Sequence, residues 1–383
     1  MKRISFCDLA KLNLPMMAEI ERSLLRVARS GRYIGGTEVS DFEEKLCRLT
    51  GAGYAVGTGN GLDALKLIMR GWIATGVLQY GDEVIAAANT YIASILAIED
   101  AGLVPRLVDP DPETMLLSAE GIERHVTDKV KAVMPVHLYG RVDWNEDIAD
   151  VVRSHGLLVI EDCAQAIGAR PSAAGVCGRR NMAGALGHAG ALSFYPTKNI
   201  GALGDAGAVL TDDKELAQAV RALSNYGSDR RYHNIIAEGC NSRLDPIQSA
   251  VLSVKLDYLE SVGRRRRKVA AIYDRLIDNC VVVKPEIPET AEEHVWHQYV
   301  VKVPDRWCRE SFRQHLERKG VQTDVHYAVP PHLQPCYRGR IWAQQEFHVT
   351  CDLADRVVSL PVATVSDDEA VMVAEAVNGW RIP

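Results

Sequence analysis

The chain has 383 residues and a formal net charge of −6 at pH 7, with 47% hydrophobic and 25% charged residues. This length exceeds that of one typical domain, and the apolar content can build a sizeable core, so the composition excludes a disordered chain. A protein that binds the phosphates of nucleic acids needs a basic surface. The acidic balance therefore argues against a nucleic-acid partner.

The cysteines are scattered along the chain, and no Cys-x-x-Cys pair occurs. This usage predicts reduced thiols rather than a disulfide framework or a zinc site. The first residues carry charges and a proline where a signal peptide needs an apolar stretch, and no window approaches the roughly 20 apolar residues of a membrane span. We expect a cytoplasmic protein that does not bind a membrane. The nine cysteines are Cys7, Cys47, Cys163, Cys177, Cys240, Cys280, Cys308, Cys336 and Cys351.

Short apolar runs alternate with helical patterns through the first half of the chain. Apolar strands that are separated by helices indicate a buried, mostly parallel sheet that is covered on both faces. The sequence therefore predicts an α/β core. The expected strands are 54–56, 82–88, 131–136 and 157–162, and the expected helices are 62–70, 91–101 and 144–155.

The pattern changes at Asp245, which is predicted to cap a helix whose first residue is Pro246. This helix is expected to continue to about Leu276, with a bend at Gly263. A long helix without an internal proline can connect two domains. The basic run at 264–268 on this helix is expected to be a solvated face.

A smaller α+β unit is expected after this helix. Its predicted elements are strands at 281–283 and 321–326, an alternating segment at 294–303 and a helix at 309–319. We divide the chain into a large domain, residues 1–264, and a small C-terminal domain, residues 265–383.

Glycines surround Asn60 in the segment 57–61, which follows a predicted strand and opens a predicted helix. Glycines at such a junction let backbone N–H groups approach an anion at the positive end of the helix. A tight turn without a ligand explains the same residues. The segment lacks the third glycine of the dinucleotide fingerprint, which disfavours a nicotinamide oxidoreductase. No ligand cluster in the sequence suggests a metal site.

Two carboxylates, Glu161 and Asp162, end a predicted apolar strand. Parallel α/β sheets bind their ligands at the carboxyl ends of strands, so a carboxylate there can pair with a cationic ring nitrogen. A helix cap is the structural alternative.

Lys198 lies in a turn of Ser, Tyr, Pro and Thr residues between a short apolar strand and a glycine-rich segment. A partly desolvated lysine has a lowered pKa and can form a Schiff base, whereas a surface lysine is the simpler explanation. An anion cradle, an acid for a pyridinium and a lysine for an imine are together what pyridoxal phosphate requires from a protein. Their combination indicates this cofactor.

The motifs resemble those of the DegT/DnrJ/StrS sugar aminotransferases, pyridoxal phosphate enzymes of fold type I with an aspartate aminotransferase-like fold. The resemblance covers essentially the whole chain and implies a large domain with a mostly parallel sheet and a smaller α+β domain. A histidine replaces the lysine in a dehydrating branch of this family, so Lys198 favours amino transfer. The matching segments are 57–65, 89–94, 161–165, 193–198 and 241–245.

The resemblance implies a role for several residues around pyridoxal 5'-phosphate. Lys198 would form the imine and move the proton, Asp162 would pair with the pyridine nitrogen, and Gln165 would bond the ring hydroxyl. Tyr91 would stack on the ring. The phosphate would be held by Gly59, Asn60 and Ser193, and by Asn241 from the neighbouring subunit of a homodimer with shared active sites.

The resemblance further implies L-glutamate as the amino donor and a nucleotide-linked keto sugar as the acceptor. The segment 326–334 resembles a loop of enzymes that act at the 3-keto position of dTDP-linked 6-deoxyhexoses. A 4-keto or UDP-linked acceptor, or a non-catalytic regulator that holds the cofactor, remain alternatives, as does a purely structural role of the loop histidines. The candidate substrate contacts are Tyr33, Tyr195, Arg231, His326 and His332.

Overall fold

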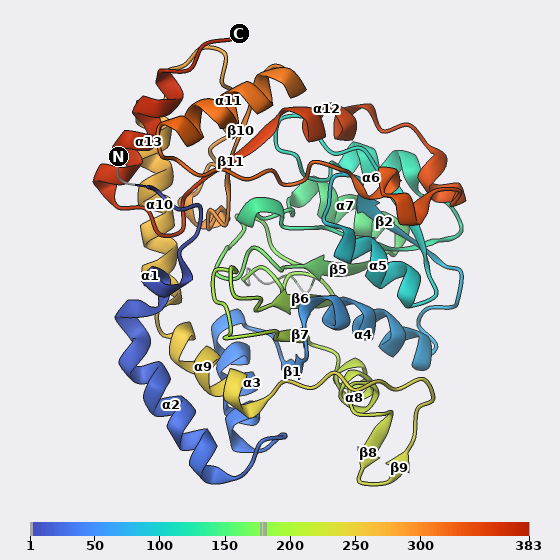
Figure 1. Cartoon of the computed structure of the whole chain (residues 1–383). Coiled ribbons are helices and arrows are strands. Elements are labelled where there is room, and N and C mark those ends of the chain that lie inside the picture. Colours follow the sequence, from blue (N-terminus) through green and yellow to red (C-terminus); the bar gives the residue numbers. More distant parts are fainter. Residues whose placement is uncertain (1–2, 177, 179–181, 383) are drawn as a thin grey trace.

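The computed structural model describes residues 3–176, 178 and 182–382. At its centre lies a seven-stranded sheet in the order β1-β7-β6-β5-β4-β2-β3 (Figure 1). Strands β2 to β6 pair in parallel, and β7 runs antiparallel to both of its neighbours. The predicted α/β fold with a mostly parallel sheet is confirmed. The strands are β1 (Tyr54–Thr58), β2 (Glu83–Ala87), β3 (Val104–Val108), β4 (Val130–Met134), β5 (Leu158–Asp162), β6 (Ala189–Ser193) and β7 (Gly207–Thr211).

Helices cover both faces of this sheet (Figure 1). One face packs against α3 (Thr37–Thr50), α6 (Ala119–His125), α7 (Glu146–His155) and α9 (Pro246–Leu256). The other face packs against α4 (Gly61–Ala74), α5 (Ile92–Asp100) and α8 (Lys214–Leu223). Successive residues of a strand point to opposite faces, so Val159 joins the first core and Ile160 joins the second.

The remaining α-helices and strands lie at the two ends of the chain and in a projecting hairpin (Figure 1). The N-terminal helices are α1 (Leu9–Asn13), the 3-10 turn η1 (Leu14–Met16) and α2 (Met17–Ser30). The hairpin consists of β8 (Ser228–Arg230) and β9 (His233–Asn234). The C-terminal part holds α10 (Leu259–Leu276), β10 (Tyr299–Lys302), α11 (Arg306–Arg318), α12 (His348–Arg356), β11 (Val357–Leu360) and α13 (Asp367–Asn378). Short 3-10 turns are η2 (Leu138–Gly140), η3 (Ala291–Glu293), η4 (Pro331–Leu333), η5 (Pro335–Tyr337) and η6 (Ile341–Gln344).

The predicted continuous helix is two helices, α9 and α10, which separate at Asp257 and Tyr258. The N–H groups of these two residues bond three residues back, which tightens the last turn of α9, and the Tyr258 hydroxyl donates to Glu19 at 2.6 Å. The helix is thus interrupted before Gly263, which lies inside α10, and the bend expected at Gly263 stays a prediction. Asp245 occupies the N-cap position of α9, but its side chain makes no capping hydrogen bond.

The C-terminal part has its own apolar core, which includes Tyr273, Tyr299, Phe312 and Trp380. The antiparallel pair β10–β11 and the helices α10, α11 and α13 surround this core. The proposed domain boundary between residues 264 and 265 lies inside α10, and the division into two domains stays a prediction.

Two strands that we expected in this part do not form, so these two predictions are wrong. Segment 281–283 forms a single bridge to β10, and segment 321–326 forms single bridges to Ile4 and to Ser359. Each segment finds only isolated partners, so no continuous ladder forms. The partner strand of β10 is instead β11, which the sequence analysis missed.

The basic run at 264–268 is not a uniformly solvated face. Arg264 and Lys268 are exposed, but Arg266 is 1% exposed, and its Nη1 donates to the carbonyls of Trp296 at 3.1 Å and His297 at 3.0 Å. Burial lowers the pKa of Arg266 to about 10. The expectation is therefore wrong at Arg266, which fixes the 296–297 backbone.

Eight of the nine cysteines are described, and all eight are free thiols, as predicted; Cys177 lies outside the described residues. Within the described part of the chain, no helix has both the length and the apolar character that a membrane crossing requires.

Glu161 is a fully buried carboxylate at the end of β5 that joins three segments. It accepts hydrogen bonds from the N–H groups of Gly184, Leu186 and Gly187, each at 2.7 Å. It also contacts His137 Nε2 at 2.8 Å. Because His137 Nδ1 accepts from the N–H of residue 143, Nε2 carries the hydrogen and donates to Glu161.

The variant Glu161→Gln should lower the free energy of unfolding by about 3 kcal/mol, because an amide nitrogen would face groups that can only donate. Urea denaturation measures this loss. The matched control is Glu123→Gln, which alters an exposed Glu–His pair with His155 and should cost less than about 1 kcal/mol. Equal losses in the two variants would contradict the role of Glu161.

Candidate active site

The sheet register brings the predicted cofactor segments to one edge. Thr58 at the end of β1 pairs with Gly207, and Gly207 pairs with Ser193 at the end of β6. On the other side of β6, Asp162 pairs with Ala191. Three strand ends and the start of β7 therefore form one continuous edge, where α/β sheets place their ligands.

The turn between β1 and α4 is fixed by side-chain hydrogen bonds. The Gly59 N–H donates to Ser242 Oγ at 3.1 Å, and the Asn60 side chain caps α4 by accepting from the Asp63 N–H at 2.8 Å. Ser242 Oγ in turn donates to Asp63 Oδ2 at 2.7 Å. The Gly59 N–H that we expected at a phosphate is thus already bonded, and Gly59 and Asn60 as phosphate contacts remain predictions.

Ser193 lies against the first turn of α4. A Cβ atom on Gly61 would lie 2.6 Å from the Ser193 Cβ, so only glycine permits this approach. The first N–H groups of a helix have no intrahelical partner, and the helix dipole adds positive potential there. Ser193 and this helix start together form a cradle that suits a phosphate.

Asp162 is 6% exposed and is oriented by a chain of hydroxyls. Its Oδ2 accepts from Ser94 Oγ at 2.7 Å, and its Oδ1 accepts from the Ala164 N–H at 3.1 Å. Because Ser94 uses its hydrogen on Asp162, Thr90 donates across the 2.9 Å contact with Ser94. Asp162 is therefore a rigid carboxylate, as a partner for a pyridinium must be.

Lys198 lies in a turn after β6, where its N–H donates to the Tyr195 carbonyl at 2.8 Å. Burial lowers the pKa of Lys198, and the charge of Asp162 partly opposes this shift. The next residue, Asn199, is buried and accepts from His297 Nδ1 at 3.0 Å. Burial and the nearby Lys198 hold the pKa of His297 well below its usual range, so the imidazole is neutral.

Gln165 and Tyr91 meet at Tyr327, which comes from the C-terminal part. Gln165 Nε2 donates to the Tyr327 hydroxyl at 3.0 Å, and the Tyr91 and Tyr327 rings lie 5.1 Å apart. Burial, opposed by the Gln165 bond, raises the pKa of Tyr327. Tyr91 itself is 52% exposed, which leaves part of its side chain open to a ligand.

The two candidate histidines differ in their surroundings. His326 Nδ1 contacts Ser359 Oγ at 2.8 Å, and burial lowers its pKa, with Asp324 opposing and Lys198 adding to the shift. His332 is 6% exposed, packs on Phe347 and lies 3.7 Å from a cysteine sulfur. The structure therefore brings His326 into the electrostatic range of Lys198 and buries His332 in a separate contact.

The remaining candidates lie on the surface. Tyr33 and Tyr195 are about half exposed, and Asn241 is exposed beside the Ser242 that holds Gly59. Arg231 lies on the β8–β9 hairpin, with its guanidinium 4.8 Å from the ring centre of its neighbour Tyr232. None of these four side chains makes a hydrogen bond to the Lys198 or Asp162 side chain within the described part of the chain.

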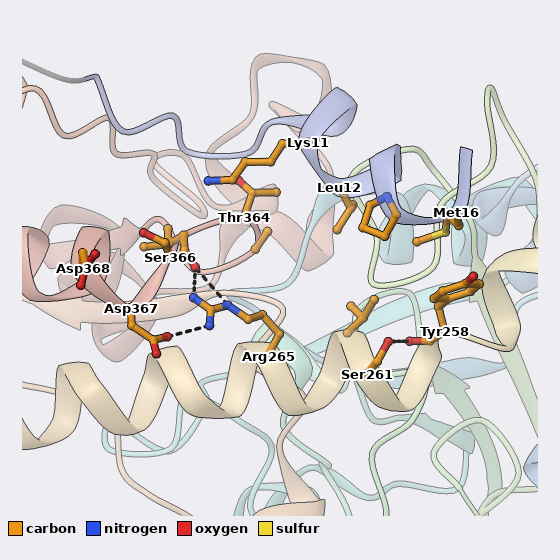
Figure 2. A pocket seen from close by; sticks show the side chains of 14 residues that line it. Lys11, Leu12, Met16, Tyr258, Ser261, Arg265, Thr364, Ser366, Asp367 and Asp368 are labelled. Atoms are coloured by element: carbon orange, nitrogen blue, oxygen red, sulfur yellow. Dashed lines mark hydrogen bonds and ion pairs between the residues drawn. The ribbon is translucent and has the colours of Figure 1, made fainter. Parts of the chain in front are cut away.

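A cavity of about 590 Å³ lies elsewhere, between the N-terminal turns, the start of α10 and the start of α13 (Figure 2). Arg265 on its wall is paired with Asp367, and no candidate site residue lines it. The strand-edge cluster, with its perturbed lysine and oriented carboxylate, is the better candidate for chemistry.

Ser94, Ser242 and Tyr327 were not predicted as site residues, although each contacts a candidate residue. Each lies inside a segment that we had already recognised, at 89–94, 241–245 and 326–334. The sequence does show that each is a polar residue within a motif. It does not show the candidate residue that each one contacts, because that residue is far away in the sequence.

The cluster fits pyridoxal phosphate on its chemistry. The close approach of Ser193 to Gly61 forms an anion cradle, Asp162 is a buried and oriented carboxylate, and Lys198 is an amine with a lowered pKa. These groups lie on one edge of the sheet, as the cofactor requires.

Comparisons with known proteins agree with this chemistry. The model of the DegT/DnrJ/EryC1/StrS aminotransferase family matches residues 15–378. The chain is 45% identical to a dTDP-3-amino-3,6-dideoxy-alpha-D-galactopyranose transaminase of Aneurinibacillus thermoaerophilus, over 98% of this chain and 99% of that protein. It is 37% identical to a dTDP-3-amino-3,4,6-trideoxy-alpha-D-glucose transaminase of Streptomyces venezuelae, over 99% and 96%. The crystal structure of S. venezuelae DesV with a ketimine intermediate superposes with a TM-score of 0.91, at 37% identity and 100% coverage of both chains.

The variant Asp162→Asn should shift the titration of Lys198 in the cofactor-free protein further to low pH. The carboxylate stabilises the ammonium, so its removal lowers the pKa again. The measurement is the pH dependence of Lys198 labelling by trinitrobenzenesulfonate, followed on the peptide by mass spectrometry. The control Asp368→Asn changes an exposed carboxylate and should leave the midpoint in place. A shift to higher pH in Asp162→Asn would refute the pairing.

Proposed function

Because the chain belongs to the DegT/DnrJ/EryC1/StrS aminotransferase family, we propose that it transfers an amino group from L-glutamate to the C3 keto group of a dTDP-linked keto-deoxysugar. It is a pyridoxal phosphate-dependent aminotransferase, as the sequence predicted. The observation that carries the C3 assignment is the 45% identity, over nearly the whole chain, to a transaminase named for a dTDP-3-amino sugar.

The cofactor, when bound, supplies a ring that accepts electrons from the carbon that loses its proton. In the proposal, the Nζ of Lys198 takes this proton from the amino-acid carbon and returns it to the cofactor carbon. The lowered pKa of Lys198 favours the neutral amine that this transfer needs. Glutamate leaves as 2-oxoglutarate, whose keto oxygen comes from water, and the sugar keto oxygen leaves as water when nitrogen bonds to the sugar carbon, so the two half-reactions balance.

Asp162 keeps a proton on the ring nitrogen in this proposal, and the Thr90–Ser94 chain holds its carboxylate in one orientation. Ser193 and the start of α4 bind the phosphate, with Gly59 and Asn60 shaping the turn. Gln165 donates toward the ring hydroxyl, and Tyr91 covers the ring.

The sugar nucleotide is proposed to enter over Tyr195 and His326. Tyr195 is exposed beside the turn that holds Lys198. His326 is close enough to Lys198 for the charge of the lysine to lower the pKa of the histidine. Arg231 and Tyr33 supply a cation and a ring for the nucleotide diphosphate. A contact of His332 with the substrate stays a prediction, because its ring is buried against Phe347.

We further propose a homodimer in which Asn241 reaches the partner's phosphate. Asn241 is exposed, and its neighbour Ser242 is bonded to Gly59, so this side chain is accessible to a partner subunit near the phosphate cradle. The cytoplasm is the proposed location, in keeping with the free thiols.

Incubation with glutamate and a panel of dTDP- and UDP-linked 3-keto and 4-keto sugars tests the function. We expect 2-oxoglutarate release and an amine at C3 of the dTDP-linked 3-keto sugar, identified by mass and NMR. Lys198→Ala should lose activity by on the order of 10³-fold or more, together with the absorbance of covalently bound cofactor. The control Lys302→Met removes another lysine whose pKa is lowered by burial, on β10, and should keep that absorbance. Amination only of 4-keto or UDP-linked sugars would refute the assignment.

Shared active sites predict complementation. Lys198→Ala and Asn241→Asp should each have low activity alone, the second because its carboxylate repels the phosphate. Unfolding and refolding the two together should restore about a quarter of the wild-type activity, since half of the dimers then carry one intact site. A monomer with full activity, or a mixture without recovery, would contradict the dimer.

A further inference from the structure

Tyr139 joins the cofactor side of the candidate site to the segment 326–327 of the C-terminal part. It lies in η2, and its backbone has φ +60° and ψ 4°, which bulky residues seldom adopt. The side chain is 6% exposed and packs in a cluster with Leu353 and Val357. A strained conformation of this kind persists only where the surroundings fix it.

The backbone end of Tyr139 holds Gln165. Its N–H donates to Gln165 Oε1 at 2.6 Å. An N–H can only donate, so this bond settles which end of the Gln165 amide is the oxygen. Nε2 must then point to the Tyr327 hydroxyl, which lies 3.0 Å away. The Tyr327 hydroxyl accepts this bond and keeps its own hydrogen for another partner.

The side-chain end of Tyr139 holds the segment that carries His326. The Tyr139 hydroxyl donates to the His326 carbonyl, which can only accept. Burial raises the pKa of Tyr139, with a smaller contribution from Tyr327, so the phenol keeps its hydrogen. One residue thus bonds Gln165 through its backbone and His326 through its side chain.

We propose that Tyr139 is a positioning residue that sets the placement of His326 and Tyr327 relative to Gln165. This inference rests on the proposed function, in which Gln165 contacts the cofactor and His326 the sugar. Without the Tyr139 hydroxyl, the His326 carbonyl loses its bond to Tyr139. The segment 326–327 is then held to the cofactor side by the bond between Gln165 and the Tyr327 side chain, while Gln165 stays in place. Small displacements of a positioning group are costly, because reacting atoms must meet within a narrow range of geometry.

The variant Tyr139→Phe tests this, because it keeps the ring, the backbone and the bond to Gln165. We expect the rate constant kcat/KM for the keto sugar to fall about tenfold, while that for glutamate changes less than about twofold. The absorbance of the bound cofactor should not change. Hydrogen exchange of the backbone amides at 325–329 in the cofactor-free protein should be faster than in the wild type.

The matched control is Tyr273→Phe. The Tyr273 hydroxyl is likewise buried and donates to a carbonyl, that of Pro361, in the C-terminal core. Both variants should lower Tm to a similar degree, but only Tyr139→Phe should change the sugar half-reaction and the exchange at 325–329. An equal effect of Tyr273→Phe, an equal loss in both half-reactions of Tyr139→Phe, or a Tyr139→Phe chain that fails to fold would overturn the proposal.

Failure of the proposed function gives a different result. In that case the wild-type protein itself would aminate no dTDP-linked 3-keto sugar. The hydrogen-exchange comparison of the two tyrosine variants would still decide whether Tyr139 holds the 326–327 segment, since it needs neither cofactor nor substrate. Unchanged exchange in Tyr139→Phe would overturn the inference by itself.

Discussion

Two neighbouring carboxylates at the end of β5 connect the fold to the site. Glu161 and Asp162 are adjacent in a strand, so their side chains point to opposite faces of the sheet. Glu161 holds His137 and the 184–187 backbone on one face, whereas Asp162 meets Ser94 of α5 on the other. The position of Asp162 is therefore fixed by the packing of both layers. A shift of one residue in β5 would exchange the two environments.

The sequence predicted the central sheet well because its strands are short apolar runs with helices between them, and both faces are buried. Prediction failed where distant partners decide the structure. Nothing local marks the separation of α9 from α10 at Asp257, where Tyr258 bonds to Glu19. Segment 321–326 has the composition of a strand, but among the described residues it forms only single β-bridges, to Ile4 and to Ser359. In the sequence, nothing distinguishes Arg266 from its basic neighbours. It is buried because the carbonyls of residues 296 and 297, which are distant in the sequence, accept its hydrogen bonds.

In the candidate site, too, some residues could be predicted from the sequence and others depend on distant partners. Lys198 and Asp162 were predicted from residue type and place, and Gln165 from the family resemblance, and the strand register brings their segments to one edge of the sheet. The residues that orient them were not predicted. Ser94 acts on a carboxylate far along the chain, and Tyr139 acts through its backbone N–H, a group that every residue except proline has. Such partners become visible only once the chain is folded.

The antiparallel strand β7 has a consequence for Lys198. Since β7 lies beside β6 and runs in the opposite direction, residues 194–206 return directly to the sheet without a crossover helix. Lys198 thus sits on a short loop that is anchored at both ends to the centre of the sheet. The loop is further held by a hydrogen bond from the Phe194 N–H to the Ala206 carbonyl. Gly201 also lies so close to the Pro196 backbone that no side chain would fit there. An amine on such a loop has little freedom to move, so variation in loop length between relatives should occur elsewhere, for example in the projecting β8–β9 hairpin.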